Sequence, residues 1–201
     1  MHPKLLLATN NTGKIKEFRS LLQGVPFELV TPKETGIVMN VEESGATYRE
    51  NARLKACTLA AQSSLLTLAD DSGIEVDVLH GAPGVLSARY AGENASDIER
   101  VDYLLSKLKD VPPEKRSARF YCVIAMAKPD GTVQFCDGEC KGTITVKPAG
   151  VTGFGYDPVF YLPEFGKTMA ELPVEIKNQI SHRAKAAQKA KMLLLKMANT
   201  A

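Results

Sequence analysis

Four short polar clusters in this 201-residue chain contain the side chains best suited to chemistry. The first cluster lies between a predicted strand and a predicted helix and consists of Thr9, Asn10, Asn11, Thr12, Gly13 and Lys14. Backbone N–H groups at a helix N-terminus, with a lysine in the first turn, are suited to binding phosphate. The spacing of a Walker A loop is missing. The alternative interpretation is an Asn/Gly-rich turn that only caps the helix.

Two further clusters are acidic. Residues 42–45 (Glu-Glu-Ser-Gly) lead into a predicted helix that carries Asn51 and Lys55, which share one helical face because they are four residues apart. Residues 70–73 (Asp-Asp-Ser-Gly) follow a buried apolar strand, and a carboxylate pair at such a strand end is a frequent site for Mg²⁺. The alternatives are a solvated, capped helix start for the first of these clusters and a purely conformational Asp-rich turn for the second.

The fourth cluster combines a glycine-rich segment, residues 153–158, with Lys177 and with the run Ser181, His182 and Arg183. Glycines beside two aromatic residues leave the backbone open to a flat ligand that stacks on a ring. If Ser181 caps the last helix, two potentially cationic side chains fall in its first turn, where cations are disfavoured. An anion or a keto oxygen bound there would relieve the conflict.

The elements that must position these clusters are predicted from apolar periodicity and capping signals. Thr47 with Glu50, and Ser96 with Glu99, form capping-box patterns that start two helices. The remaining predicted elements are strands at 4–9, 65–69 and 74–78, a helix at 14–22, a hairpin of 118–127 with 132–136, and a helix at 181–198. Helices and strands alternate without strict βαβ regularity, so we expect an α/β fold with a mixed twisted sheet and flanking helices.

Composition excludes several classes of protein. The net charge is only +2, so no global basic field indicates nucleic-acid binding. The apolar run at residues 5–8 is too short for a signal peptide or a membrane span, and we expect a soluble intracellular protein. No CxxC pair or zinc-ligand spacing occurs, so reduced thiols serving as small apolar residues are expected at Cys57, Cys122, Cys136 and Cys140.

Taken in order along the chain, these clusters make the sequence similar to the inosine/xanthosine triphosphate pyrophosphatase family, the non-standard purine NTP pyrophosphatases. The similarity covers nearly the whole chain and is carried by residues 8–14, 42–45, 47–56, 69–73, 81–90, 153–158 and 180–183. It implies a single elongated domain over residues 1–201, with two lobes and a central cleft that binds the triphosphate. It also implies a cytoplasmic, Mg²⁺-dependent homodimer that has no nucleic-acid or membrane partner. The implied activity is hydrolysis of ITP, dITP and XTP to monophosphate and pyrophosphate, which keeps these nucleotides out of DNA and RNA.

The resemblance also assigns roles by position. Asp71 resembles the catalytic, metal-binding carboxylate, and Glu42 resembles a second metal ligand, with neighbouring Glu43 left open. The segment Thr9 to Lys14, together with Lys55, would hold the triphosphate, and Ser72 would contact the substrate. The base- and substrate-recognition set would be Phe154, Gly155, Tyr156, Asp157, Lys177, His182 and Arg183.

The implied reaction agrees with the residue types. Water attacks the α-phosphorus while pyrophosphate leaves, and lysines with Mg²⁺ stabilise the charge that builds on the phosphoryl oxygens. A carboxylate such as Asp71 can orient the water and accept its proton. One rival is a pyrophosphatase for modified pyrimidine triphosphates. Another is a non-catalytic nucleotide- or RNA-binding module, which would not need Asp70, Asp71 and Glu42 together, and the third is a structural α/β domain.

Overall fold

The computed structural model describes residues 2–199 and divides by contacts into two compact units. The first unit holds the chain up to Asp71, residues 122–138 and the chain from Arg183 onward. The second unit holds residues 72–121 and 139–182. The chain therefore passes from one unit to the other inside two of the predicted clusters, between Asp71 and Ser72 and between His182 and Arg183. Each unit has a buried apolar cluster of its own.

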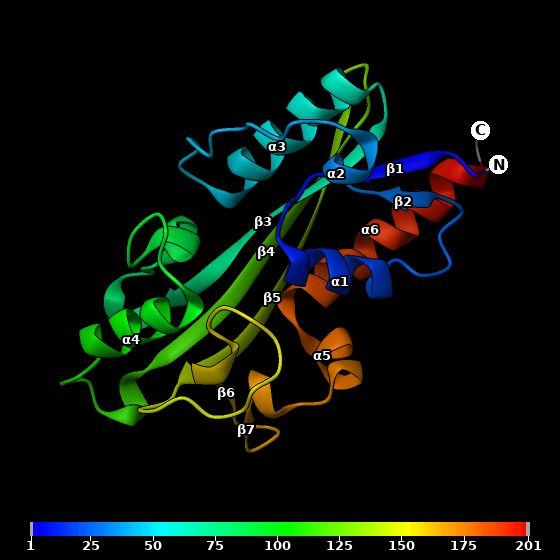
Figure 1. Ribbon diagram of the computed structural model, residues 1–201. Helices are drawn as coiled ribbons and strands as arrows, with labels where there is room; N and C mark the ends of the chain where they lie inside the picture. The colour runs from blue at the N-terminus through cyan, green and yellow to red at the C-terminus, as the bar shows by residue number, and fades with distance from the viewer. Residues whose placement is uncertain (1, 200–201) are drawn as a thin grey trace. The chain divides into compact units, whose positions relative to one another are not determined.

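Seven strands form one mixed sheet in the order β2-β1-β3-β4-β5-β6-β7 (Figure 1). Their bounds are β1 Lys4–Leu7, β2 Glu28–Val30, β3 Leu66–Val76, β4 Ser117–Ala127, β5 Val133–Ile144, β6 Phe160–Leu162 and β7 Lys167–Thr168. Strand β1 pairs in parallel with β2 and with β3, whereas β6 pairs antiparallel with β5 and with β7. The expected mixed sheet with flanking helices is confirmed.

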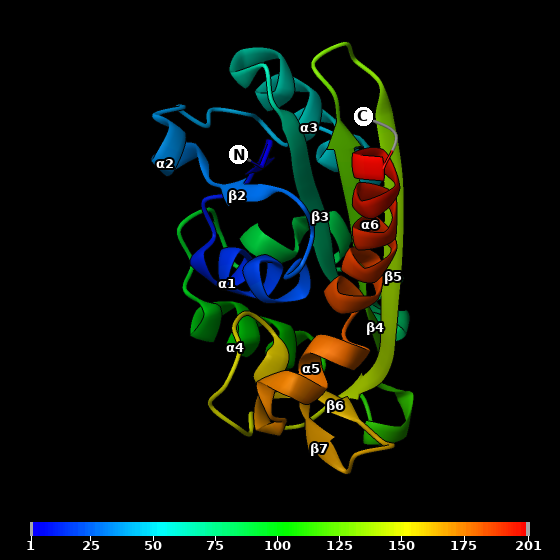
Figure 2. The same cartoon turned by 90° about the vertical axis from the view of Figure 1, so that its right-hand side faces the viewer.

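In the first unit, the helices are α1 Thr12–Leu21, α2 Pro32–Thr35, α3 Tyr48–Ser63 and most of α6 His182–Asn199. Helices α1 and α6 cover one side of the strands and α3 covers the other, as the two views in Figures 1 and 2 show. On the α1 side, Phe18 and Leu22 pack with Leu68 and with Ala190 of α6. Burying aliphatic and aromatic side chains of this size stabilises a fold by about 1.5–3 kcal/mol each. The two helices are thereby fixed against the strand that carries Asp70.

The second unit contains α4 Asp97–Lys107, α5 Val174–Ile180 and five short 3₁₀ segments. The 3₁₀ segments are Asp77–Leu79, Gly84–Arg89, Pro113–Lys115, Asp157–Val159 and Met169–Glu171. Its core gathers Leu104 of α4, Phe120 of β4, Phe160 of β6 and Met169, and Ile176 of α5 packs against it. This core supports the glycine-rich segment at residues 153–158.

The predicted helix starts are confirmed where capping residues signalled them. Thr47 accepts from the backbone N–H of Glu50, and Ser96 accepts from that of Glu99, so both capping boxes are present. The hairpin between β4 and β5 is also confirmed, with Lys128 donating to the carbonyl of Thr132 and Gly131 at a φ of 87°. A positive φ of this kind favours glycine.

One predicted boundary is wrong. Residues 70–73 are not a turn between two strands, because β3 continues through them as one 11-residue strand, and Asp70 and Asp71 stay in it since Lys14 and Lys55 compensate their charge. No helix among residues 2–199 is long and apolar enough to cross a membrane.

Candidate functional site

Asp71 lies on the α3 side of β3, in contact with two side chains from that helix. Lys55 Nζ donates to Asp71 Oδ1 at 3.3 Å, and Asn51 Nδ2 donates to Asp71 Oδ2 at 3.2 Å. Lys55 also donates to Glu43 Oε1 at 2.7 Å. The capping box at Thr47 sets the start of α3, and the four-residue spacing then puts Asn51 and Lys55 on one buried face.

The pKa of Asp71 is raised. Burial is the largest cause, and it outweighs the lowering effect of Lys55 and Lys14. The pKa of Lys55 is raised as well: burial alone would lower it, but the negative charges of Asp71, Asp70 and Glu43 prevail. The lysine therefore stays an ammonium, while the carboxyl group beside it binds protons more readily than an ordinary aspartate.

Asp70 points to the opposite side of β3, as alternation along a strand requires. Its fully buried carboxylate contacts Lys14 Nζ at 3.0 Å and Arg183 Nη2 at 3.4 Å. Arg183 contacts Glu17 Oε2 at 2.7 Å as well. Burial alone would raise the pKa of Asp70, but Lys14 and Arg183 hold it well below its ordinary value. Asp70 and Glu17 thus supply the negative charge that the start of α6 was expected to need.

The first predicted cluster is a strand-to-helix connection that ends in Lys14. Asn11 caps α1, since its Oδ1 accepts from the backbone N–H of Lys14 at 3.0 Å. Thr9 is buried and accepts from the backbone N–H of Asn11 at 3.2 Å. Asn10 and Thr12 are exposed, and Gly13 is half-buried. The cap and the lysine of this cluster are therefore both present at the N-terminus of α1.

Glu42, the predicted second metal ligand, and its neighbour Glu43, the alternative, differ in their surroundings. Glu42 is exposed, whereas Glu43 is half-buried and in contact with Lys55. Mg²⁺ takes oxygen ligands and usually binds one or two carboxylates together with substrate phosphates. Asp71 and a glutamate of this pair match that donor chemistry. Within residues 2–199, no group of three or more His, Cys, Asp and Glu side chains lies close enough to hold a metal by itself.

In the second unit, the glycine-rich segment is held by Asp157. The carboxylate of Asp157 accepts from the backbone N–H of Phe154 at 3.0 Å and pairs with Lys177, both side chains being buried. The ammonium of Lys177 also lies 5.0 Å from the centre of the Phe154 ring. Gly153 has a φ of 81°, and a Cβ there would meet Asp157 Oδ2 at 2.0 Å, so only glycine fits. The hydrogen bond to Asp157 and the neighbouring ammonium of Lys177 together fix the position of Phe154.

The remaining predicted residues lie around this segment. Gly155 donates its backbone N–H to Asp97 Oδ2 at 2.7 Å, and the hydroxyl of Tyr156 donates to the carbonyl of Ser87 at 2.9 Å. His182 is buried and stacks on Phe120 with ring centres 4.7 Å apart. Ser72 is half-buried on β3.

The sequence reasoning missed Glu17 and Asp97. Glu17 carries no local signal, because its partner Arg183 lies 166 positions away. Asp97 has a local signal only as an acidic residue after Ser96 in the first turn of α4, a position that favours helix formation. Burial alone would raise the pKa of Asp97, but the N–H of Gly155 and the guanidinium of Arg100 lower it.

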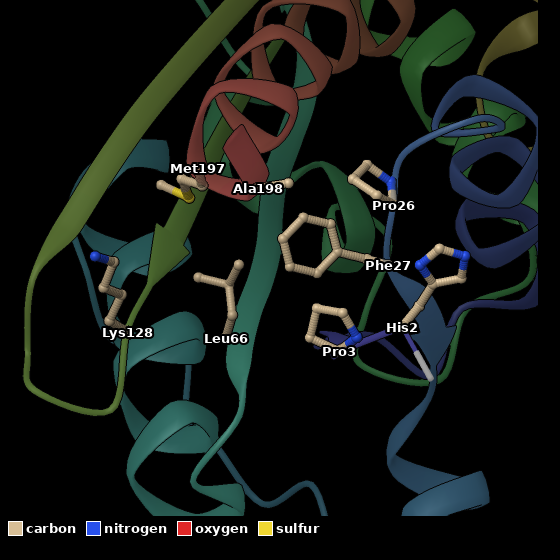
Figure 3. Close-up of a pocket in the computed structure, with 8 residues that line it drawn as sticks. All are labelled: His2, Pro3, Pro26, Phe27, Leu66, Lys128, Met197 and Ala198. Atoms are coloured by element: carbon tan, nitrogen blue, oxygen red, sulfur yellow. The ribbon is translucent and has the colours of Figure 1, made fainter. Parts of the chain in front are cut away.

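A pocket of about 490 Å³ lies elsewhere in the first unit (Figure 3). It is lined by His2, Pro3, Pro26, Phe27, Leu66, Lys128, Met197 and Ala198. None of these residues belongs to the predicted site, and the lining is mainly apolar. This pocket is therefore separate from the charged groups described above.

The arrangement defines a class of protein: an α/β chain in which a lysine pairs with a buried carboxylate on each side of one strand, suited to a phosphate-rich ligand. The chain belongs to the Ham1 family, whose model matches residues 5–193. A relative from Desulforamulus reducens named dITP/XTP pyrophosphatase is 50% identical over 191 residues, which are 95% of each chain. A relative of the same name from Escherichia coli O157:H7 is 50% identical over 185 residues, 91% of this chain and 93% of the other.

Solved structures agree with the family. The Ham1 protein of Staphylococcus aureus superposes with a TM-score of 0.86 at 41% identity, over 96% of this chain and 99% of that one. A HAM1 protein of Coxiella burnetii gives a TM-score of 0.88 at 40% identity, with the same coverage of both chains. The similarity to the inosine/xanthosine triphosphate pyrophosphatase family that the sequence clusters indicated is confirmed.

Proposed function

We propose that this chain hydrolyses non-standard purine nucleoside triphosphates (dITP, ITP and XTP) to the monophosphate and pyrophosphate. The observation that carries the proposal is the contact of Asp71 with Lys55 and Asn51, a buried carboxylate beside a buried ammonium. Relatives named dITP/XTP pyrophosphatase match nearly the whole chain at about half identity, which supports the same activity here.

The phosphate tail would be bound by the first unit. Lys55 is buried and charged, and Lys14 follows the capped connection of residues 9–13. Ammonium groups and backbone N–H donors stabilise the charge that builds on phosphoryl oxygens as pyrophosphate leaves. Because both lysines are held by carboxylates before substrate arrives, little reorganisation is needed when phosphate replaces part of those contacts.

Asp71 is proposed as the catalytic carboxylate. It would orient the attacking water towards the α-phosphorus and accept a proton from that water. Asn51 donates to one of its oxygens and thereby fixes the plane of the carboxylate.

A divalent ion is typical of nucleotide pyrophosphatases, and we propose Mg²⁺, with Asp71 and Glu42 as its protein ligands and Glu43 as the alternative second ligand. When bound, Mg²⁺ would neutralise charge on the phosphoryl oxygens. Glu42 is exposed, whereas the carboxylate of Glu43 is in contact with the ammonium of Lys55. Exchange of each glutamate for glutamine, followed by titration of the Mg²⁺ requirement, separates the two ligands.

The base and the rest of the substrate would be recognised by Ser72, by residues 154–157 and by Lys177, His182 and Arg183. Hypoxanthine and xanthine carry an acceptor at O6, whereas adenine carries an amino donor. A buried donor left unpaired against adenine discriminates by as much as about 10⁴-fold. The Phe154 ring of this set suits stacking on a flat base, whereas the N–H groups of Phe154 and Gly155 already donate to Asp157 and Asp97. The guanidinium of Arg183 contacts Glu17 and Asp70, and its role towards the base stays a prediction.

The test is a screen of nucleoside triphosphates for pyrophosphate release, with and without Mg²⁺. We expect Mg²⁺-dependent turnover of dITP, ITP and XTP, at least about 100-fold faster in kcat/KM than turnover of ATP. Preference for modified pyrimidine triphosphates would favour the pyrimidine alternative. Binding without turnover of any triphosphate would favour a non-catalytic module.

The proposal extends to setting and assembly. The nucleotide pool is cytoplasmic, and a cytoplasmic homodimer with small-molecule substrates, and no nucleic-acid or membrane partner, agrees with the family resemblance. Light scattering of the purified chain tests the dimer. A mass equal to the 21.8 kDa of one chain would contradict it.

A further inference from the structure

Asp70 is a fully buried carboxylate to which the proposed chemistry gives no role. Alternation along β3 turns it away from Asp71, and it forms salt bridges with Lys14 of α1 and Arg183 of α6. A buried carboxylate is costly unless it is paired, and replacing a buried ion pair by apolar residues is often neutral or stabilising. Stability alone therefore does not explain why a charge occupies this position.

The contact with Lys14 suggests what the charge does. Lys14 Nζ lies 3.0 Å from Asp70 Oδ2, and the lysine side chain is 16% exposed while that of Asp70 is fully buried. A lysine side chain loses rotamer entropy when it is fixed in one position, so a partner that holds it in advance reduces this loss on binding. An ammonium has three N–H donors, so one can stay on Asp70 while the others face a ligand.

The carboxylate is itself held on its other side. Arg183 donates to Asp70 Oδ2 from Nε and from Nη2, at 3.4 Å each, and its Nη1 donates to Glu17 at 2.7 Å. Arg183 and Glu17 are buried as well. The planar guanidinium thus fixes the carboxylate, and the carboxylate fixes the flexible lysine.

We propose that Asp70 is a positioning residue that holds the ammonium of Lys14 in place for the phosphate tail of the substrate. The proposal rests on the proposed function, because Lys14 binds phosphate only if a triphosphate is the substrate. Asp70 acts through Lys14 and touches neither the substrate nor the reacting atoms. Removing Asp70 should therefore matter only while Lys14 is present.

The test is a double-mutant cycle of Asp70→Asn and Lys14→Met, read as kcat/KM for inosine triphosphate with Mg²⁺. We expect Asp70→Asn to lower kcat/KM about 10- to 100-fold, as expected for loss of one charge-assisted hydrogen bond. In the Lys14→Met background the same exchange should change it less than about threefold, since residues that act through one another are non-additive. Equal losses in both backgrounds, or no loss in either, would overturn the proposal.

A matched control comes from the same unit. Asp137 and Lys189 form an exposed pair at 3.4 Å, so Asp137→Asn makes the same chemical change without affecting the buried network. We expect it to leave kcat/KM unchanged. If Asp70→Asn does not fold, Asp70→Glu keeps the charge and displaces the carboxylate by one methylene, and the same cycle with Lys14→Met applies.

Binding of inorganic tripolyphosphate, measured by calorimetry, separates failure of this proposal from failure of the proposed function. We expect Asp70→Asn to weaken tripolyphosphate binding about tenfold, and to have no further effect once Lys14 is methionine. If the unmodified chain releases no pyrophosphate from any nucleotide, the proposed function fails, and the binding cycle still decides the role of Asp70. Unchanged tripolyphosphate affinity in Asp70→Asn would overturn the proposed positioning role of Asp70.

Discussion

The polar sets of the two units are built differently. In the first unit, Asp70 and Asp71 contact ammonium and guanidinium groups from three helices. In the second unit, one ion pair, Asp157 with Lys177, holds a glycine-rich segment that carries the aromatic ring of Phe154. Clustered charges suit a phosphate tail and a cation, whereas an aromatic ring suits a flat, uncharged base. Under the proposed function, substitutions in the two units should therefore affect different parts of the reaction.

The largest effect is expected at Asp71. Asp71→Asn keeps the shape and removes the base, so kcat should fall about 1,000-fold, within the range for loss of a general acid–base group. Pyrophosphate release under saturating substrate measures it. Glu114→Gln, at an exposed site, is the matched control and should turn over normally. Near-normal kcat in Asp71→Asn would remove Asp71 from the catalytic role.

The next effect is on stability and concerns the second unit. Lys177→Met leaves the buried carboxylate of Asp157 without its ammonium partner, and we expect a loss of about 3–5 kcal/mol in the free energy of unfolding. The double variant Lys177→Met with Asp157→Leu removes both charges and should recover part of the loss. Urea denaturation measures both. If the double variant loses as much free energy of unfolding as the two single variants added together, the pair does not act as a unit.

A third prediction separates the two neighbouring aspartates by pH, in protein kept free of metal with a chelator. The pKa of Asp70 lies below its ordinary value of 3.8, so its charge stabilises the fold at neutral pH, and that stability is lost only as pH falls below 3.8 through the depressed pKa. The pKa of Asp71 lies above 3.8, so its charge destabilises the fold at neutral pH, and this penalty disappears as pH falls through the raised pKa towards 3.8.

Asp70→Asn should therefore lower the free energy of unfolding at pH 7 by about 2 kcal/mol or more, whereas Asp71→Asn should raise it. The gain in Asp71→Asn should vanish near pH 4, while the loss in Asp70→Asn should persist there, because Asp70 is still ionised at that pH. Thermal unfolding at several pH values checks both. If both substitutions change the free energy of unfolding in the same direction at pH 7, the two carboxylates do not have opposite effects on stability.

Local signals in the sequence predicted a good part of this arrangement. The capping box at Thr47 fixed the phase of α3, and with it the shared face of Asn51 and Lys55. Non-local pairing could not be predicted in the same way. The continuity of β3 through Asp70 depends on Lys14 and Arg183, and Arg183 lies 113 positions after Asp70 in the sequence. The clusters were therefore predicted as groups, but which carboxylate faces which cation was not.

The smallest expected effect is at Asp97, and it tests the second unit alone. Asp97 Oδ2 accepts the backbone N–H of Gly155 at 2.7 Å, so Asp97→Ala frees the glycine-rich segment from α4. We expect KM for inosine triphosphate to rise about 3- to 10-fold, the worth of one hydrogen bond, with kcat nearly unchanged. Asp102→Ala, at an exposed position of the same helix, is the control. Because tripolyphosphate lacks a base, its affinity should be the same in both variants, and a parallel loss of tripolyphosphate binding in Asp97→Ala would mean that the two polar sets do not divide base from phosphate.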